Sequence, residues 1–84
     1  MIIYFHSQFK NSYKDLPDGI KRKAEKKETI FKNNPFDPRL KIHKLHGKLK
    51  KLWSFSIDKN YRVILEFIAK DVIFLDIGTH GLYK

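Results

Sequence analysis

The chain has 84 residues, of which 42% are hydrophobic and 14% aromatic, and its formal net charge is +9. This length supports one domain over residues 1–84 with a single modest core, and the absence of cysteine excludes disulfides and thiolate metal sites. No apolar run approaches the roughly 20 residues that cross a bilayer, and the N-terminus lacks signal-peptide features, so we expect a cytoplasmic protein that does not contact a membrane. The positive charge predicts an anionic partner, with nucleic acid first and an acidic protein second.

The first half of the chain predicts one strand followed by two helices. Residues 2–6 form a short run of β-branched and aromatic residues, which is typical of a strand. Ser7 is a suitable N-cap for a helix over residues 8–14. Pro17 fits the first turn of a second helix, because its missing N–H costs nothing there. The segment Asn33-Asn34-Pro35 should end that helix, since a residue before proline avoids the helical region.

The second half changes to a period of two, which indicates strands. After a loop over residues 36–49, with a short extended piece expected around residues 44–49, apolar residues alternate with polar ones from Trp53 onward. Further strands are predicted over residues 61–68 and 72–77. The order β-α-α-β-β-β predicts an α+β fold in which two helices cover one face of a twisted, mostly antiparallel sheet.

A basic segment precedes the first strand of the second half. No carboxylate occurs between Asp37 and Asp58. Lysines of the second helix either form its solvated face or add to the same positive surface. The residues of the basic segment that we expect to contact RNA are Arg39, Lys41, Lys44, His46, Lys48, Lys50 and Lys51.

The four histidines differ in what their positions predict. His43 and His46 are three residues apart, but a metal site is disfavoured because no cysteine or carboxylate cluster completes a coordination shell. His6 ends the first strand and is interpreted as structural. His80 follows the last strand and a glycine, where a side chain can project into a cleft. An imidazole there is either a surface group or a proton donor and acceptor near neutral pH.

Arg62 lies in the middle of a predicted strand, where an unpaired guanidinium is costly to bury. It either pairs with Glu66 or Asp76, or it faces an incoming phosphate, whose geometry its planar fork matches. Histidine, arginine, lysine and tyrosine suffice to cut RNA without metal, because the RNA 2′-hydroxyl is itself the nucleophile. No cofactor is expected, since the sequence lacks a glycine-rich phosphate loop and other cofactor motifs.

The segments HKLHGKLKKLWSF, NYRVIL and DIGTHGLY resemble the RelE/ParE superfamily of type II toxin–antitoxin toxins, in the branch of the RelE-, YoeB- and YafQ-like mRNA interferases. The resemblance covers nearly the whole chain. It implies a microbial-ribonuclease-like fold, ribosome-dependent cleavage of translated mRNA, and a cognate antitoxin with an acidic, partly disordered segment. ParE-like members of the superfamily instead inhibit DNA gyrase by binding, and that alternative stays open.

The resemblance also implies roles for individual residues. Arg62 matches an arginine that contacts the phosphate in relatives, and His80 matches a catalytic histidine or arginine. Tyr83 matches a C-terminal aromatic residue that stacks on a base or positions the phosphate. His43 matches a histidine of the YafQ-like branch. One position departs from the pattern, because Gly81 stands where relatives often have an aspartate. Activity is therefore expected to be reduced if that carboxylate takes part, and a weakened toxin retained for antitoxin binding is a third alternative.

Overall fold

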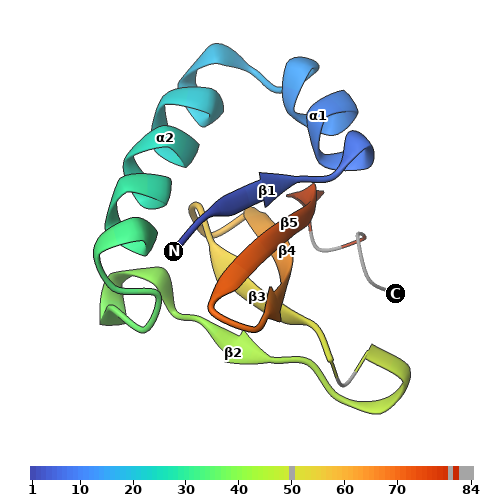
Figure 1. Cartoon of the computed structure of the whole chain (residues 1–84). Coiled ribbons are helices and arrows are strands. Elements are labelled where there is room, and N and C mark those ends of the chain that lie inside the picture. Colours follow the sequence, from blue (N-terminus) through green and yellow to red (C-terminus); the bar gives the residue numbers. More distant parts are fainter. Residues whose placement is uncertain (50, 80, 82–84) are drawn as a thin grey trace.

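The computed structural model describes residues 1–49, 51–79 and 81. In this part of the chain, a mixed sheet of five strands in the order β1-β5-β4-β3-β2 packs against two helices (Figure 1). The elements in chain order are β1 (Ile3–Phe5), α1 (Ser7–Lys14), α2 (Asp18–Asn33), the 3-10 helix η1 (Pro38–Leu40), β2 (His43–Lys44), the 3-10 helix η2 (Gly47–Leu49), β3 (Trp53–Ser56), β4 (Tyr61–Ile68) and β5 (Asp71–Thr79).

The pairing of the strands confirms the predicted α+β fold. β1 pairs with β5 in parallel, while β2, β3, β4 and β5 form an antiparallel meander. The short strand β2 replaces the extended piece expected around residues 44–49, because residues 47–49 form η2 instead. Gly47 has a left-handed backbone with φ of 70°, which favours glycine and fits the predicted bend.

The core lies between the helices and one face of the sheet. Along β4 the side chains of Val63 and Leu65 are 1% and 0% exposed, as the alternation predicted. Phe31 of α2 is fully buried, with its ring 5.3 Å from Phe55 in a stacked arrangement and 5.2 Å from Phe74 edge-on. Burial of such rings contributes most of the free energy that orders a domain of this size.

The predicted end of α2 is confirmed, whereas the predicted N-cap of α1 is wrong. α2 ends at Asn33, and Asn34 is extended with φ of −160°, as expected for the residue before a proline. The N-cap of α1 is His6 and not Ser7, because the His6 Nδ1 accepts a hydrogen bond of 3.0 Å from the backbone N–H of Gln8. His6 therefore has the structural role that the sequence indicated.

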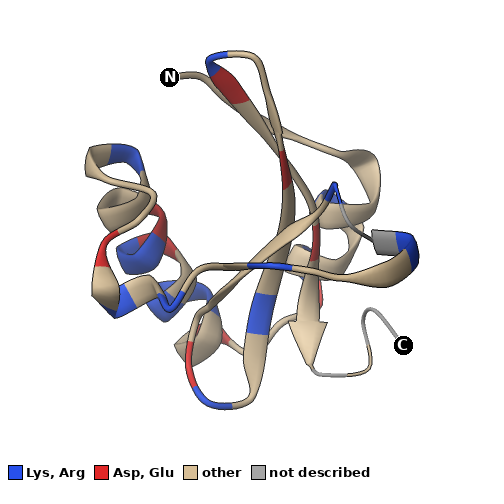
Figure 2. Ribbon diagram, turned by 90° about the horizontal axis from the view of Figure 1, so that it is seen from below, with Lys and Arg blue, Asp and Glu red and all other residues tan. Residues whose placement is uncertain are grey.

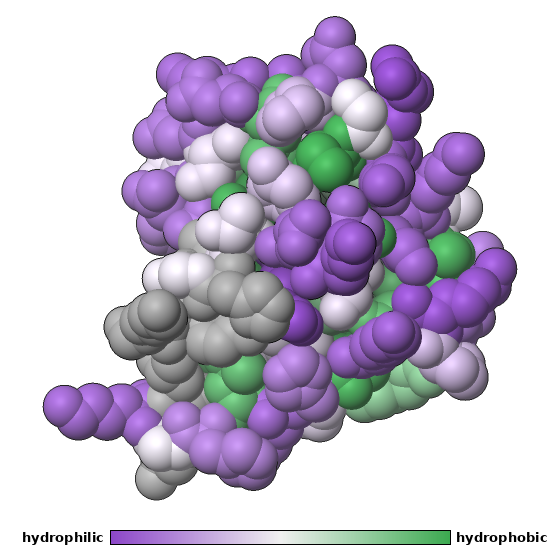
Figure 3. Space-filling view, turned by 180° about the vertical axis from the view of Figure 1, so that it is seen from behind, coloured by the Kyte–Doolittle hydropathy of each residue, from purple (hydrophilic) through white to green (hydrophobic). Residues whose placement is uncertain are grey.

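The surface agrees with the composition. On the face shown in Figure 3, hydrophilic side chains cover most of the area, and hydrophobic ones appear as small patches between them. None of the helices in the described part of the chain combines the length and the apolar character needed to span a membrane.

Candidate functional site

Basic side chains from distant segments line one hollow of about 410 Å³ at the end of the sheet where β4 begins. They come from α2, from η1 and the residue after it, from β2, from the turn between β3 and β4, and from β4 itself. Figure 2 shows the corresponding blue segments on these parts of the chain, with fewer red ones among them. The polar and charged residues that line the hollow are Lys27, Arg39, Lys41, His43, Ser56, Asp58, Lys59 and Arg62.

Arg62 is held at the centre of this arrangement by the sheet. In the register of the strands it lies between Ser56 of β3 and Gly78 of β5. One terminal nitrogen, Nη1, donates a hydrogen bond of 3.4 Å to the Ser56 hydroxyl. Because Gly78 has no side chain, β5 places no side chain next to the guanidinium at this register position. Arg62 therefore presents a planar, half-buried cation on the face of the sheet opposite the core.

Asp58 contributes the negative charge of the hollow, but its oxygens are committed to the fold. Its Oδ1 accepts hydrogen bonds from the backbone N–H groups of Asn60 and Tyr61, at 2.8 and 2.9 Å, and its Oδ2 lies 3.4 Å from the Lys23 ammonium. These contacts, with the Asn60 N–H the largest, hold the pKa of the carboxyl below its usual value. Asp58 therefore closes the β3–β4 turn and is a poor proton acceptor.

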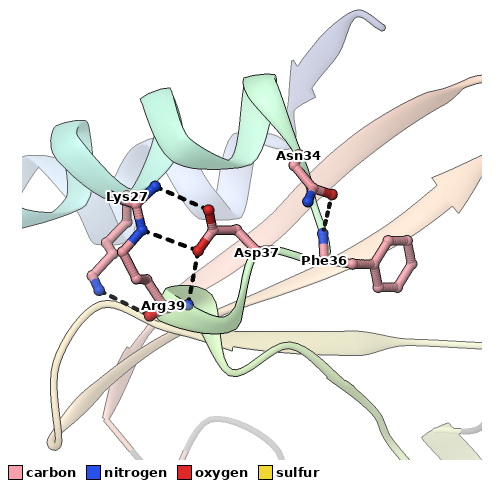
Figure 4. Close-up of polar contacts among 5 residues, drawn as sticks. All are labelled: Lys27, Asn34, Phe36, Asp37 and Arg39. Atoms are coloured by element: carbon pink, nitrogen blue, oxygen red, sulfur yellow. Dashed lines mark hydrogen bonds and ion pairs between the residues drawn. The ribbon is translucent and has the colours of Figure 1, made fainter.

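Arg39 reaches the hollow from η1 and is clamped by a neighbouring carboxylate (Figure 4). Its Nε donates to Asp37 Oδ1 at 3.0 Å, and its Nη2 donates to Oδ2 at 2.9 Å. The side-chain hydrogen bonds from Arg39, followed by its backbone N–H, lower the pKa of Asp37 to about 2. Lys27 joins α2 to η1, because its Nζ donates a hydrogen bond of 3.0 Å to the backbone carbonyl of Arg39.

Lys41 and His43 follow Arg39 along the chain. Lys41 has a left-handed backbone with φ of 52°, a conformation that turns the chain from η1 toward β2. The ring nitrogen Nδ1 of His43 lies 3.3 Å from the Lys41 carbonyl oxygen. Since a carbonyl oxygen can only accept, Nδ1 donates in this hydrogen bond in the tautomer that carries its proton there, and Nε2 is then the acceptor of the ring. His43 is exposed.

The structure thus brings together four of the residues singled out from the sequence: Arg39, Lys41, His43 and Arg62. Lys44 and Lys51 line a separate hollow, and His46 and Lys48 are exposed in the connection between β2 and β3. Lys50, His80 and Tyr83 lie outside the described residues. Gly81 is exposed, and a Cβ added there would meet no heavy atom of the described structure within 4 Å.

Sequence reasoning missed Lys27, Lys59 and Ser56 as members of the hollow. Lys27 is one of several lysines on α2, and the helical period alone does not say which of them faces η1. The bidentate contact between Asp37 and Arg39 did have a local signal, because an aspartate two residues before an arginine at a helix start can cap and pair at once. Three or more histidine, aspartate or glutamate side chains do not gather into a metal-binding group anywhere among the described residues.

Comparisons with solved structures place this fold among toxins of toxin–antitoxin systems. YafQ from Escherichia coli strain BL21(DE3) superimposes with a TM-score of 0.82 at 23% identity, covering 99% of this chain and 98% of that one. YafQ within the E. coli DinJ-YafQ toxin-antitoxin complex gives 0.80 at 23% identity, covering 99% and 97%. The archaeal RelE-RelB complex from Pyrococcus horikoshii OT3 gives 0.73 at 21% identity, covering 95% and 94%. At these identities the likeness shows a shared RelE-like fold.

The sequence itself matches a family model over residues 14–80, described as the HigB-like RelE-like toxin of type II toxin-antitoxin systems. The chain therefore belongs to this family of type II toxin–antitoxin toxins. The comparison with curated proteins gave no match.

Proposed function

We propose that this toxin is a ribosome-dependent endoribonuclease that cleaves translated mRNA without a metal ion. The observation that supports this function best is the convergence of Arg39, Lys41, His43 and Arg62 on one hollow. Together with Lys27 and Lys59 these groups give a strongly positive, shaped surface, while the lining carboxylate of Asp58 is held in a turn. Such a surface matches the phosphate backbone of a single strand of RNA.

In the proposed mechanism, Arg62 binds the two non-bridging oxygens of the scissile phosphate through its fork. The 2′-hydroxyl attacks the adjacent phosphorus, the bond from phosphorus to the 5′-oxygen breaks, and a 2′,3′-cyclic phosphate and a 5′-hydroxyl are formed. Arg62 and Lys41 stabilise the extra negative charge of the crowded phosphorane. This contribution is largest where charge develops, so it lowers the barrier more than it tightens substrate binding.

Two histidines serve as the proton acceptor and donor of this reaction. His43, with Nδ1 donating to the Lys41 carbonyl, has Nε2 available to accept the 2′ proton. His80 follows directly after Thr79, which pairs with Tyr61 next to Arg62 in β4. We assign to His80 the protonation of the leaving 5′-oxygen, and to Tyr83 the stacking of a base beside the phosphate.

The partners follow from the same charge. Solved structures with this fold include a DinJ-YafQ toxin-antitoxin complex and a RelE-RelB complex. An acidic segment of a cognate antitoxin would neutralise the present toxin by covering the hollow of Arg39, Lys41 and Arg62. Ribosomal RNA and the mRNA in the decoding site would occupy it when the antitoxin is absent.

A reconstituted translation reaction with mapping of mRNA ends tests this function. We expect the wild-type chain to cut within codons, and the Arg62→Gln, His43→Gln and His80→Gln variants to cut about 10²- to 10⁴-fold more slowly. Lys70→Gln is the matched control, because Lys70 is exposed in the β4–β5 turn and lies outside the hollow. Uncut mRNA combined with a DNA-damage response in cells would overturn the nuclease and favour a gyrase inhibitor.

A further inference from the structure

A second hollow, of about 390 Å³, lies on the other side of β2. It is lined by Lys44, Lys51, Trp53, Glu66 and Phe67. Successive residues of a strand point to opposite faces, so His43 faces the first hollow while Lys44, paired with Trp53, faces the second. The two-residue strand β2 at the edge of the sheet therefore separates two basic hollows.

An aromatic cluster with one exposed ring, Phe36, and two partly buried ones, Trp53 and Phe67, adjoins the second hollow. Phe36 lies edge-on to Trp53 with ring centroids 5.7 Å apart, and nearly parallel to Phe67 at 6.0 Å. Its side chain is 57% exposed although the ring is large and apolar. The exposure is built into the fold, because the Phe36 backbone N–H donates to Asn34 Oδ1 at 3.0 Å, and the ring points away from the Asp37–Arg39 pair (Figure 4).

The charges beside this cluster are suited to a nucleotide. Lys44 and Lys51 are exposed, and neither forms an ion pair with any described residue. Glu66 adds one carboxylate, which disfavours an acidic peptide but can accept hydrogen bonds from the exocyclic amine of a base. An aromatic surface with adjacent ammonium groups is the usual combination for binding a single strand.

We propose that the hollow formed by Lys44, Lys51, Trp53, Glu66 and Phe67, with Phe36 at its edge, binds one nucleotide of a single-stranded RNA. The base stacks on the exposed ring of Phe36, the two lysines bind its phosphate, and Glu66 selects an amino-bearing base such as cytosine. The proposal rests on the proposed function in taking RNA as the ligand, and it adds a base-binding subsite across β2 from the reaction centre.

Trp53 makes this subsite directly observable, because it is the single tryptophan of the chain. The experiment is a titration of the full chain with short 2′-O-methyl oligoribonucleotides, which cannot be cleaved, followed by tryptophan fluorescence. We expect binding to quench Trp53, and Phe36→Leu to weaken binding about five- to a hundredfold through loss of stacking. Because the two lysines bind one phosphate, Lys44→Gln combined with Lys51→Gln should reduce the slope of log affinity against log salt by about 0.7.

Glu66→Gln should remove the preference for oligocytidine over oligouridine, while Lys70→Gln should change none of these values. Circular dichroism melting of each variant shows that the fold is retained. The subsite is refuted if Trp53 fluorescence does not respond or if Phe36→Leu binds RNA as the wild type does. It is also refuted if Phe36→Leu weakens binding of a co-expressed antitoxin but leaves RNA binding unchanged. Cleavage by the wild type in translation, with no Trp53 response, would reject the subsite and leave the nuclease standing.

Discussion

Replacing Asp37 with asparagine should strengthen RNA binding by releasing the guanidinium of Arg39. In the free protein both nitrogens of that fork donate to Asp37, at 3.0 and 2.9 Å. A phosphate that binds the edge formed by Nε and Nη2 must displace the carboxylate, so Asp37 lowers the affinity of the hollow for RNA. The asparagine oxygen can still accept the backbone N–H of Arg39, which now donates to Asp37 Oδ1 at 2.9 Å, so η1 keeps its cap.

The size of the effect follows from the number of cations in the hollow. For a single strand, each phosphate contact contributes about 0.7 to the slope of log affinity against log salt. Arg39 is one of five lysines and arginines that line the hollow, so its release in Asp37→Asn should steepen the slope by about 0.7. Relief of one exposed ion pair should also tighten binding about 1.5- to 5-fold at low salt.

Fluorescence anisotropy of a labelled 2′-O-methyl strand, measured over a series of salt concentrations, gives both values. Glu28→Gln is the matched control, because Glu28 forms an ion pair of 3.5 Å with Lys32 and lines a different hollow between the helices and the sheet. Both variants gain one unit of net positive charge. Equal tightening by both would mean that net charge, and not the release of Arg39, governs binding, and the reasoning would then be wrong.

Three further predictions concern single groups. Ser54 is fully buried, and its hydroxyl has no hydrogen-bond partner among the described residues. Ser54→Ala should therefore leave the melting temperature unchanged or raise it by about 4–8 °C; a lower melting temperature in calorimetry would contradict this. The carboxyls of Asp37 and Asp58 have lowered pKa values, to about 2 for Asp37. Their contribution to stability is therefore present above pH ~4 and lost as pH falls toward 2; acid titration by circular dichroism should show this loss, reduced in Asp37→Asn, and equal acid profiles would count against it. Gly81→Asp introduces the aspartate that relatives often have at this position, where an added Cβ meets no described heavy atom within 4 Å. It should raise the cleavage rate by up to about a hundredfold; an unchanged rate would show that the missing carboxylate does not limit cleavage.

The helices and long strands could be predicted from the sequence because local signals and packing agree there. The period of two places Val63 and Leu65 on the buried face of β4, although Ile64 between them is also buried, at 5% exposed. The residues before Pro35 predict the end of α2. β2 could not be predicted in the same way, since two residues carry no period and the strand exists through its pairing with β3. The His6 cap was missed because an imidazole replaces the usual hydroxyl or carboxylate at that position.

The candidate site was predicted in part for a similar reason. Arg62 and the basic segment are recognisable from residue type and order, and their charge requires a partner. The convergence of Lys27, Arg39 and His43 depends on how α2, η1 and β2 pack against one another, which residue order alone does not encode. Phe36 falls in a predicted loop and Trp53 in a predicted half-buried strand, and the contact between their rings depends on how the loop folds back, which the sequence does not show.

The central claim is that the basic hollow promotes attack by the RNA's own 2′-hydroxyl. The most direct test places a single 2′-deoxynucleotide on the 5′ side of the mapped cleavage position in a ribosome-bound mRNA. The proposed mechanism predicts that the all-ribose mRNA yields 2′,3′-cyclic phosphate and 5′-hydroxyl ends, and that the substituted mRNA stays intact at that position. Cleavage of the substituted mRNA, or 5′-phosphate ends from either substrate, would contradict it.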